Sequence, residues 1–281
     1  MEDLSKTYYQ IEQFLSDLES KGIRVQSMER STLLAYSEDK EMVALLRQWA
    51  AIDVQQFFHF VSLRYSKSRL NDELDLFNTA SDIRDRDSGI VHSSFLNTQM
   101  VSAAEFKNAL EDTLISWTIL ETVFGNLLLV ESDYGICKMS FIDEDGFNTE
   151  ELALEFPFSR LINQQGPNAA LVKSYLSDWE IPDQKISLFI SGTPFQQQVW
   201  KAMLTIPFGS LRTYDFISKD IANPKAIRAV GTAIGKNPVT YLIPCHRVVR
   251  TDGYMGQFRW KAERKKLLNV YEAAQKLRMA F

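Results

Sequence analysis

The sequence predicts a multidomain protein that combines helical segments with an α+β segment, and three observations lead to this prediction. The hydrophobic pattern has helical spacing up to about residue 70, changes to short strand-like runs after Ser116, and becomes helical again after Pro194. The length of 281 residues is enough for two domains or slightly more. The basic and acidic residues are also divided unevenly along the chain.

Apolar residues with helical spacing define the first segment. The stripes lie at residues 8–18, 42–49 and 57–63. The first stripe ends near Gly22. Residues 71–112 are polar and acid-rich, and we expect one or two helices and a linker there. The predicted first domain therefore spans residues 1–112.

The middle segment alternates short strands with turns. The strand-like runs lie at residues 117–121, 125–130 and 136–141. The spacers 122–125 and 132–135 contain glycine and predict hairpin turns. Further elements are predicted as helices at 150–156 and 169–179 and a strand at 186–190. Together these elements predict a small α+β domain at residues 113–191.

The last segment, residues 192–281, returns to helical spacing. Helices are predicted at residues 195–205, 213–220 and 225–236. The last two are joined by the four residues of a turn that ends at Pro224, which is the spacing of a helix-turn-helix. The second helix of the pair carries Lys225, Arg228 and Lys236. Any two short helices can have this spacing, so it does not by itself establish DNA binding.

The formal net charge of −5 hides an uneven distribution. Residues 195–281 carry 15 of the 31 basic and 5 of the 36 acidic residues, a local net charge of +10, which leaves −15 for the rest of the chain. A basic segment of this kind favours an anionic partner such as nucleic acid, although a solvated basic helix face gives the same count.

Composition also limits the class of protein. No apolar run reaches the roughly 18 residues of a membrane span, and the first residues do not resemble a signal peptide. Cys137 and Cys245 are the two cysteines, so a Cys-based zinc cage is excluded and a structural disulfide is not expected. We therefore expect a cytoplasmic protein that uses no membrane, metal or other cofactor.

The run IPCHRVV at residues 243–249 places a thiol, an imidazole and a guanidinium in sequence. A thiol with a pKa near 8.5 is mostly protonated at neutral pH, so a fast cysteine nucleophile needs a neighbouring base or positive charge. His246 could be that base for Cys245 and would need an acceptor to orient it. The carboxylates downstream are Asp252, Glu263 and Glu272. An isolated Cys-His pair is more commonly an inert buried cysteine next to a hydrogen-bonded histidine.

The residues around this run resemble the O6-alkylguanine-DNA alkyltransferases, also called methylated-DNA–protein-cysteine methyltransferases. The similar motifs are GTPFQQQVW at 192–200, IPFG at 206–209, TY at 213–214, AIRAVG at 226–231, GKNP at 235–238, RW at 259–260 and RK at 264–265. The resemblance is continuous from about residue 192 to residue 272, and a chance match over that length is very improbable.

The resemblance implies roles for the matching residues. Cys245 would take the alkyl group from O6 of guanine irreversibly, so each chain would react once. His246 would deprotonate Cys245 through a water molecule, with Glu272 as the orienting acid and Asn237 as the support of the active-site turn. The expected partner is double-stranded DNA that contains O6-alkylguanine, and no cofactor is implied.

The resemblance also implies how the damaged base is reached. Tyr214 and Arg228 would flip the nucleotide out of the duplex, Arg228 would fill the vacated space, and Tyr214 would hydrogen-bond the base. The remaining DNA contacts are expected from Lys225, Lys236 and Arg247. Flipping is required because a base inside a duplex cannot reach a buried thiol, and it costs a few kcal/mol.

The expected substrate pocket includes Phe258, Arg259 and Trp260. Trp260 is bulky, which suggests a pocket suited to methyl rather than large O6 adducts. The sequence departs from the family pattern at Gln257 and Phe258, where Gly-Tyr is usual, and at Lys261, where Gly is usual.

The rest of the chain resembles other parts of related proteins. The middle segment is similar to the ribonuclease-H-like half of the same family, in which Cys137 is a buried strand residue. LLRQWA at 45–50 and FFHFVSLRYSK at 57–67 resemble a degenerate AraC-type helix-turn-helix domain, as in Ada-like bifunctional proteins without the zinc domain. Its expected recognition helix starts in the acidic run SEDKE at 37–41, which would repel phosphate. We therefore expect a retained fold with weakened DNA reading.

Two other functions remain as alternatives. A non-enzymatic damage sensor or transcriptional regulator of the Ada/AraC type would bind DNA while Cys245 stays unmodified. A Cys-His hydrolase would turn over repeatedly and ignore DNA, and the helix-turn-helix with Arg228 argues against it.

Overall fold

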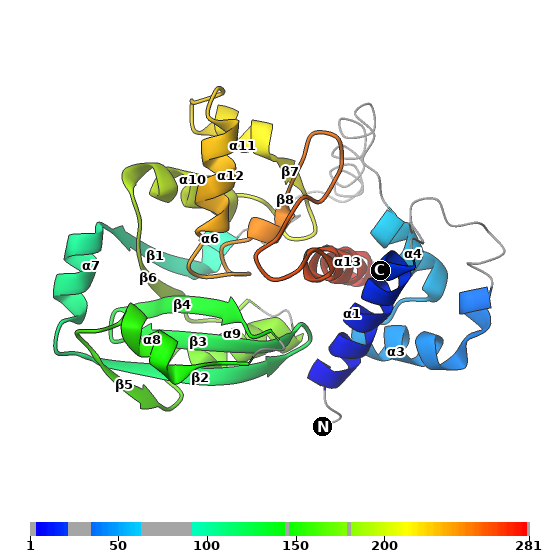
Figure 1. Cartoon of the computed structure of the whole chain (residues 1–281), viewed down its shortest axis with the longest axis horizontal. Helices are drawn as coiled ribbons and strands as arrows, with labels where there is room; N and C mark the ends of the chain where they lie inside the picture. The colour runs from blue at the N-terminus through cyan, green and yellow to red at the C-terminus, as the bar shows by residue number, and fades with distance from the viewer. Residues whose placement is uncertain (1–3, 22–34, 63–91, 144–145, 179–180, 280–281) are drawn as a thin grey trace. The chain divides into compact units, whose positions relative to one another are not determined.

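The computed structural model describes residues 4–21, 35–62, 92–143, 146–178 and 181–279 (Figure 1). The contacts divide the chain into two compact units, each made of segments that are separate in sequence. We call them the helical unit, Met1–Gly89, Pro207–Asp215 and His246–Phe281, and the sheet unit, Ile90–Ile206 and Phe216–Cys245. One of the points at which the chain passes from one unit to the other is the peptide bond from Cys245 to His246.

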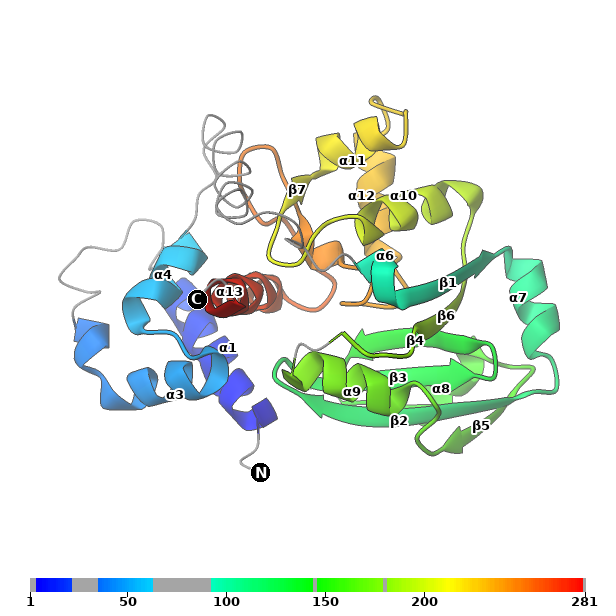
Figure 2. The same ribbon diagram turned by 180° about the vertical axis from the view of Figure 1, so that it is seen from behind.

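The helical unit is organised around its last helix. Its helices are α1 (Leu4–Ser20), α3 (Lys40–Ala50), α4 (Val54–Ser62) and α13 (Ala262–Met279). Helices α1, α3 and α4 pack against α13 (Figures 1 and 2). The rings of Trp49 and Tyr271 meet edge to face with centroids 5.2 Å apart. The apolar stripes predicted at 8–18 and 42–49 are confirmed as helices, and their burial inside the unit is what holds them together.

Local chemistry sets the limits of α3. Asp39 accepts hydrogen bonds from the backbone N–H groups of Glu41 at 3.0 Å and Met42 at 3.1 Å, which caps the helix start. Ala51 has a left-handed φ of 55° and ends the helix. Helix α4 begins three residues later and ends at Ser62. The predicted end of the first helix at Gly22 and the part of the AraC-like motif beyond Ser62 lie outside the described residues.

The sheet unit contains a six-stranded mixed sheet with the order β1-β6-β4-β3-β2-β5. The strands are β1 (Leu96–Val101), β2 (Leu114–Thr122), β3 (Gly125–Ser132), β4 (Gly135–Phe141), β5 (Arg160–Asn163) and β6 (Ile186–Ser191). Strands β2, β3 and β4 pair antiparallel through the two predicted hairpins, whereas β1, β5 and β6 pair in parallel with their neighbours. The strand-like runs and the glycine-containing spacers thus correctly predicted the three central strands and the two hairpins that join them.

Helices cover both faces of this sheet. Helices α8 (Thr149–Glu155) and α9 (Ala169–Asp178) lie on opposite faces (Figures 1 and 2). Helix α7 (Ala103–Leu110) shares the face of α8, where Leu110 and Leu152 close a core with Ile115, Val130 and Phe189. Burying these apolar side chains stabilises the packing of both helices on the sheet.

The segment at 96–110 differs from its sequence prediction. It was expected to be polar linker, with a possible helix, but it forms edge strand β1 and helix α7. Within β1 only Leu96 is buried, so the strand shows no alternating apolar pattern. It is held by backbone pairing with β6 over six residue pairs, which does not depend on side-chain type. This is why its sequence does not look like a strand.

Three further helices lie in the sheet unit, except that the first two residues of the second one belong to the helical unit. Helix α10 (Pro194–Leu204) begins with a capping box between Thr193 and Gln196, and helices α11 (Tyr214–Asp220) and α12 (Ile227–Gly235) follow. The indole Nε1 of Trp200 donates to the carbonyl oxygen of Ala233 at 2.9 Å and ties α10 to α12. Helix α12 begins two residues later than the helix that the sequence predicted at 225–236.

Gly135 in β4 provides a test of the close approach between β4 and β6. Its φ is 134°, and a Cβ there would lie 2.6 Å from the carbonyl oxygen of Ser187. We expect Gly135→Ala to lower the free energy of unfolding by about 2–4 kcal/mol, because both backbone strain and steric overlap contribute. Gly146 has a φ of 82° but no atom within 4 Å of its Cβ position, so Gly146→Ala should cost only about 1 kcal/mol. Equal losses in urea unfolding would contradict the close approach at Gly135.

Candidate active site

The turn that leads to Cys245 is closed by Asn237. This side chain is buried, and its Nδ2 donates to the carbonyl oxygen of Ile243 at 2.8 Å. Its Oδ1 accepts from the backbone N–H of Val239 at 3.0 Å. An amide side chain suits this position because it supplies both a donor and an acceptor. The geometry is consistent with the predicted support of the turn by Asn237.

Strand β4 anchors the same turn. The backbone N–H of Met139 donates to the carbonyl oxygen of Pro238 at 2.9 Å, and the carbonyl oxygen of Met139 accepts from the N–H of Thr240 at 2.9 Å. The Thr240 hydroxyl lies 3.9 Å from the sulfur of Cys245, and only 3% of Cys245 is exposed. The thiol is therefore held by a turn that the sheet fixes.

In the helical unit, the residues that follow Cys245 converge on the buried carboxylate of Glu272 in α13. Oε1 accepts from Nε2 of His246 and from Nη2 of Arg247, both at 2.8 Å. Oε2 accepts from Nε of Arg247 at 2.9 Å and from the backbone N–H of Gly209 at 3.0 Å. Of the three downstream carboxylates, Glu272 is the one that contacts the imidazole.

This arrangement determines the protonation of both groups. Burial by itself would raise the pKa of Glu272, but the charges of Arg247 and His246 and their hydrogen bonds hold that pKa far below its usual range. Burial lowers the pKa of His246, and the nearby Glu272 only partly offsets this. At neutral pH the pair is therefore a carboxylate and a neutral imidazole that donates through Nε2. The Nδ1 atom then carries the lone pair that can take a proton.

The structure corrects the predicted role of Arg247. Arg247 was expected to contact DNA, but it is completely buried and forms a bidentate ion pair with Glu272. A guanidinium committed in this way cannot reach a phosphate without leaving a carboxylate unpaired in the interior. The planar donor pair of arginine fits the carboxylate, which is why this position is filled by Arg rather than Lys.

Three further residues hold the site and were not singled out as site residues in the sequence. Lys265 is buried and donates from Nζ to the carbonyl oxygen of Val248 at 2.6 Å. Asn269 donates from Nδ2 to the carbonyl oxygen of His246 at 2.9 Å. Gly209 has a φ of 64°, and a Cβ there would lie 3.0 Å from the Lys276 side chain. For Lys265 and Asn269, the signal available in the sequence was a charged or polar residue among the apolar residues of α13.

The predicted pocket residues lie in the loop before α13. Trp260 is buried, Phe258 is half-buried against it with ring centroids 5.3 Å apart, and Arg259 is exposed with its guanidinium carbon 5.4 Å from the Trp260 ring. Tyr214 is half-buried, and its hydroxyl lies 3.8 Å from the position that a Cβ at Gly256 would occupy. Within the helical unit, Tyr214 therefore faces the loop that holds these residues.

The expected DNA contacts on the sheet unit lie at the surface. Arg228 is an exposed residue in the first turn of α12, and Lys225 and Lys236 are exposed at either end of that helix. Helices α11 and α12 are adjacent in Figure 1, joined by the short connection that the sequence predicted.

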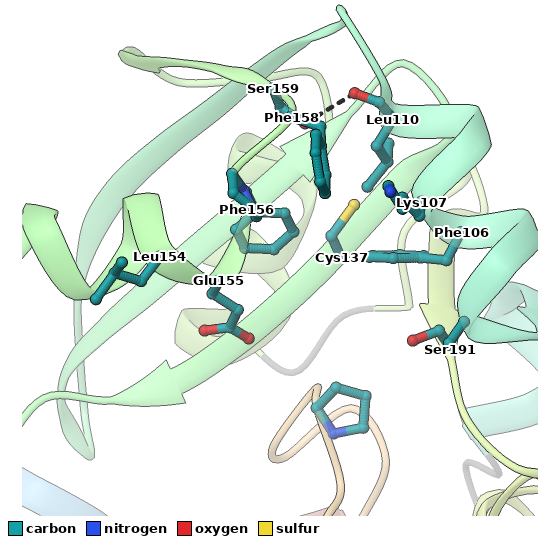
Figure 3. A pocket seen from close by; sticks show the side chains of 13 residues that line it. Phe106, Lys107, Leu110, Cys137, Leu154, Glu155, Phe156, Phe158, Ser159 and Ser191 are labelled. Carbon is teal, nitrogen blue, oxygen red and sulfur yellow. Dashed lines mark hydrogen bonds between the residues drawn. The ribbon is translucent and has the colours of Figure 1, made fainter.

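The second cysteine has different surroundings. Cys137 lines a cavity of about 380 Å³ with Phe106, Leu110 and Phe156, as Figure 3 shows. Burial raises the pKa of Cys137 to about 11, so its thiol stays protonated at neutral pH. This agrees with the interpretation of Cys137 as a structural strand residue. Apart from Pro238 in the turn before Cys245, the cavity lining contains no residue of the site described above.

In the part of the chain that the structure describes, no three His, Cys, Asp or Glu side chains come close enough together to hold a metal ion. Among the same residues, no helix combines the length and the apolar composition that are needed to cross a lipid bilayer.

Cys245 is followed directly by His246, which is paired with Glu272 in the interior. The chain also has a helix pair with basic residues at its surface. These features define the class of a cysteine-dependent transferase or hydrolase that can bind nucleic acid. Comparison with known proteins narrows this class. Residues 194–274 match the family described as 6-O-methylguanine DNA methyltransferase, DNA binding domain. The chain is 33% identical over 168 residues to the constitutive methylated-DNA–protein-cysteine methyltransferase of Bacillus subtilis, covering 57% of this chain and 97% of that protein. The chain belongs to the methylated-DNA–protein-cysteine methyltransferase family.

Longer relatives are similar over only part of their length. The chain is 34% identical over 192 residues to the bifunctional transcriptional activator/DNA repair enzyme Ada of Escherichia coli, covering 66% of this chain and 53% of that protein. The chain thus spans about half the length of the Ada proteins that it matches. A crystal structure of Mycobacterium tuberculosis O6-methylguanine methyltransferase covers 57% of this chain and 93% of its own, with 29% identity and a TM-score of 0.49.

Removing the carboxylate charge of Glu272 tests the buried ion pair. We expect Glu272→Gln to lower the free energy of unfolding by about 3–5 kcal/mol, because Arg247 would remain buried without its counter-charge. Since the pKa of Glu272 is lowered on folding, this contribution is present above its ordinary value near 4.3 and is lost only in stronger acid. Urea unfolding at pH 7 measures it, with the exposed Glu111→Gln as control. A loss no larger than the control would contradict the proposed pairing.

Proposed function

We propose that this chain repairs DNA by transferring the alkyl group of O6-alkylguanine to Cys245 in a single turnover. The observation that carries the proposal is the buried Glu272–His246 pair directly after Cys245 in the chain, at residues that match the family motif. The carboxylate of Glu272 accepts four hydrogen bonds, one of them from His246. An inert cysteine next to a histidine would not require such a carboxylate to orient the imidazole. Two relatives that the match covers over 97% and 85% of their own length carry the name methylated-DNA–protein-cysteine methyltransferase.

In the proposed reaction, Glu272 orients His246 by accepting from Nε2, and Nδ1 of His246 takes the proton of Cys245 through a water molecule. The thiolate sulfur attacks the alkyl carbon, the S–C bond forms, and the C–O6 bond breaks with its electron pair going to the base. The guanine leaving group is favoured by a hydrogen bond from Tyr214. Because the product is a stable thioether, no thiolate is regenerated and the chain reacts once.

The proposed DNA interface is the α11–α12 pair. The net charge of +10 on residues 195–281 supplies attraction to phosphate, and Lys225 and Lys236 flank the helix that carries Arg228. Arg228 would fill the space that the flipped nucleotide leaves. The proposed DNA contacts exclude Arg247, because its side chain is buried.

The proposed substrate pocket is formed by the loop with Phe258, Arg259 and Trp260. Trp260 is buried with Phe258 packed against it, and this bulk favours a methyl group over larger adducts. The range of alkyl groups is thus proposed to be narrow.

The finer assignments of the other segments are also proposals. We infer a ribonuclease-H-like arrangement for the β2-β3-β4 meander with β5 parallel to β2, and a degenerate AraC-type pair for α3 and α4. Phe57 and Phe58 of α4 are buried inside the helical unit, and the acidic run before α3 opposes contact with phosphate. These features support a domain that has kept its fold and has weakened DNA reading.

Intact mass measures the proposed transfer directly. After mixing with an O6-methylguanine duplex, the wild-type chain should gain the mass of one methyl group and no more. Cys245→Ala should gain none, and Cys137→Ala should react like the wild type because its thiol is buried and protonated. A wild-type chain that binds DNA without gaining mass would replace the proposal by a damage sensor or regulator, and repeated turnover would indicate a hydrolase.

The role of Arg228 can be separated from the chemistry. We expect Arg228→Ala to slow methyl transfer from duplex DNA by roughly 10- to 100-fold, because flipping costs a few kcal/mol and the wedge offsets part of that cost. Transfer from the free base O6-methylguanine, which needs no flipping, should be unchanged. The exposed Lys173→Gln on α9 is the control for loss of a surface charge. Equal slowing on both substrates would contradict the wedge role.

A further inference from the structure

We propose that the N-terminal helix α1 is part of the alkyl-transfer machinery, with Tyr8 and Glu12 as positioning residues that fix the start of α13. Through α13 they would hold Glu272 against His246. This inference rests on the proposed function for its kinetic consequence, but its structural consequence can be measured without DNA. The family model matches residues 194–274, so α1 lies outside the segment that this model matches.

The first step is a buried polar cluster between α1 and α13. The Tyr8 hydroxyl donates to Oε1 of Glu12 at 2.6 Å, and Nε of Arg264 donates to the Tyr8 oxygen at 3.0 Å. Nε of Arg264 also lies 3.4 Å from Oε1 of Glu12. Tyr8 and Arg264 are at most 1% exposed and Glu12 is 4% exposed. Because Arg264 is a buried charge, Glu12 is its required counter-charge within this cluster.

The second step concerns the residue just before α13. Lys261 has a φ of 65°, in the left-handed region that favours glycine, and glycine is usual there in the family pattern. Its Nζ lies 3.8 Å from Oε2 of Glu12. Glu12 therefore contacts both Lys261, at the end of the loop with Trp260, and Arg264, in the first turn of α13. This contact gives a physical reason for a lysine that the sequence showed as a departure.

The third step follows α13 from Arg264 to the site. Lys265 holds the backbone of Val248, Asn269 holds the backbone of His246, and Glu272 accepts from the imidazole itself. These three residues are at the start, middle and second half of one helix. A shift or rotation at the start of α13 would therefore move all three contacts together, and a misplacement of about 1 Å in a catalytic group can cost 100-fold in rate.

The imidazole reports on this positioning. The charged groups that act on His246 are Glu272 and Lys265 from α13 and Arg247 from its own turn, and burial is the largest influence on its pKa. If α13 is displaced and water enters, the pKa of His246 should rise toward the ordinary value near 6.5. A loss of stability without displacement of α13 would leave it unchanged.

The experiment compares four full-length variants with the wild-type chain. Glu12→Gln removes the counter-charge of Arg264, and Tyr8→Phe removes one hydroxyl while keeping the ring. Glu19→Gln is the matched control, because Glu19 pairs with Lys266 across the same two helices at the surface. The fourth chain replaces the cluster by apolar side chains, Tyr8→Phe with Glu12→Leu and Arg264→Met, which removes the unpaired charge.

The first measurement is the titration midpoint of His246 by NMR, which is practical because the chain has three histidines. The second is the single-turnover rate of methyl transfer across the same pH range, well below each variant's unfolding temperature. We expect Glu12→Gln to raise the midpoint, to move the acid limb of the rate to higher pH, and to slow transfer by roughly tenfold. Tyr8→Phe should do the same to a smaller extent, and Glu19→Gln should match the wild type.

The apolar triple variant should recover the wild-type midpoint, because it leaves no unpaired charge at Arg264. If Glu12→Gln does not fold, Tyr8→Phe decides the question. The proposal is overturned if the folded single variants at Tyr8 and Glu12 lose stability while their midpoint and pH profile stay those of the wild type. It is also overturned if Glu19→Gln has the same effect as Glu12→Gln. A wild-type chain that transfers no methyl group would refute the proposed function, whereas the NMR titration would still decide the role of α1.

Discussion

The carboxylate of Glu272 is the group on which the described site depends. It is buried on α13 and is stable there only because His246, Arg247 and the backbone of Gly209 supply four hydrogen bonds. Each of these contacts constrains another part of the chain: the turn after Cys245, the Ile206–Gly209 motif, and α13 itself. Its charge also sets the tautomer of the imidazole, so one interaction serves both the fold and the proposed chemistry.

Cys245 and His246 are held by contacts in different units. Cys245 ends a turn that Asn237 closes and that β4 anchors, and these contacts belong to the sheet unit. His246 belongs to the helical unit, where α13 fixes both its ring and its backbone. Cys137 lies in the same sheet unit as Cys245, but its thiol is buried in an apolar core with a raised pKa. The difference between the two cysteines is therefore one of surroundings, since their exposed fractions are equal.

The sequence predicted most of the fold because most elements bury a periodic apolar pattern. The hairpins of β2, β3 and β4 and the helices α1, α3 and α10 were recognisable for this reason. Strand β1 was not, because an edge strand is held by backbone hydrogen bonds and its side chains carry little pattern. The predicted domain limits at 112 and 191 remain predictions about sequence segments, whereas the contacts group residues from distant segments into the same unit.

By itself, the sequence determined which residues can do chemistry: the thiol of Cys245, the imidazole beside it, and a basic segment suited to DNA. Local motifs carry this information because they lie within a few residues of one another. The family resemblance already named Glu272 as the orienting acid for His246, whereas only the tertiary structure decided that Arg247 is an interior counter-ion rather than a DNA contact. The same is true of Glu12, which lies more than two hundred residues from Lys261 and Arg264. Charge pairing in the interior depends on distance in space, and separation along the chain does not reveal it.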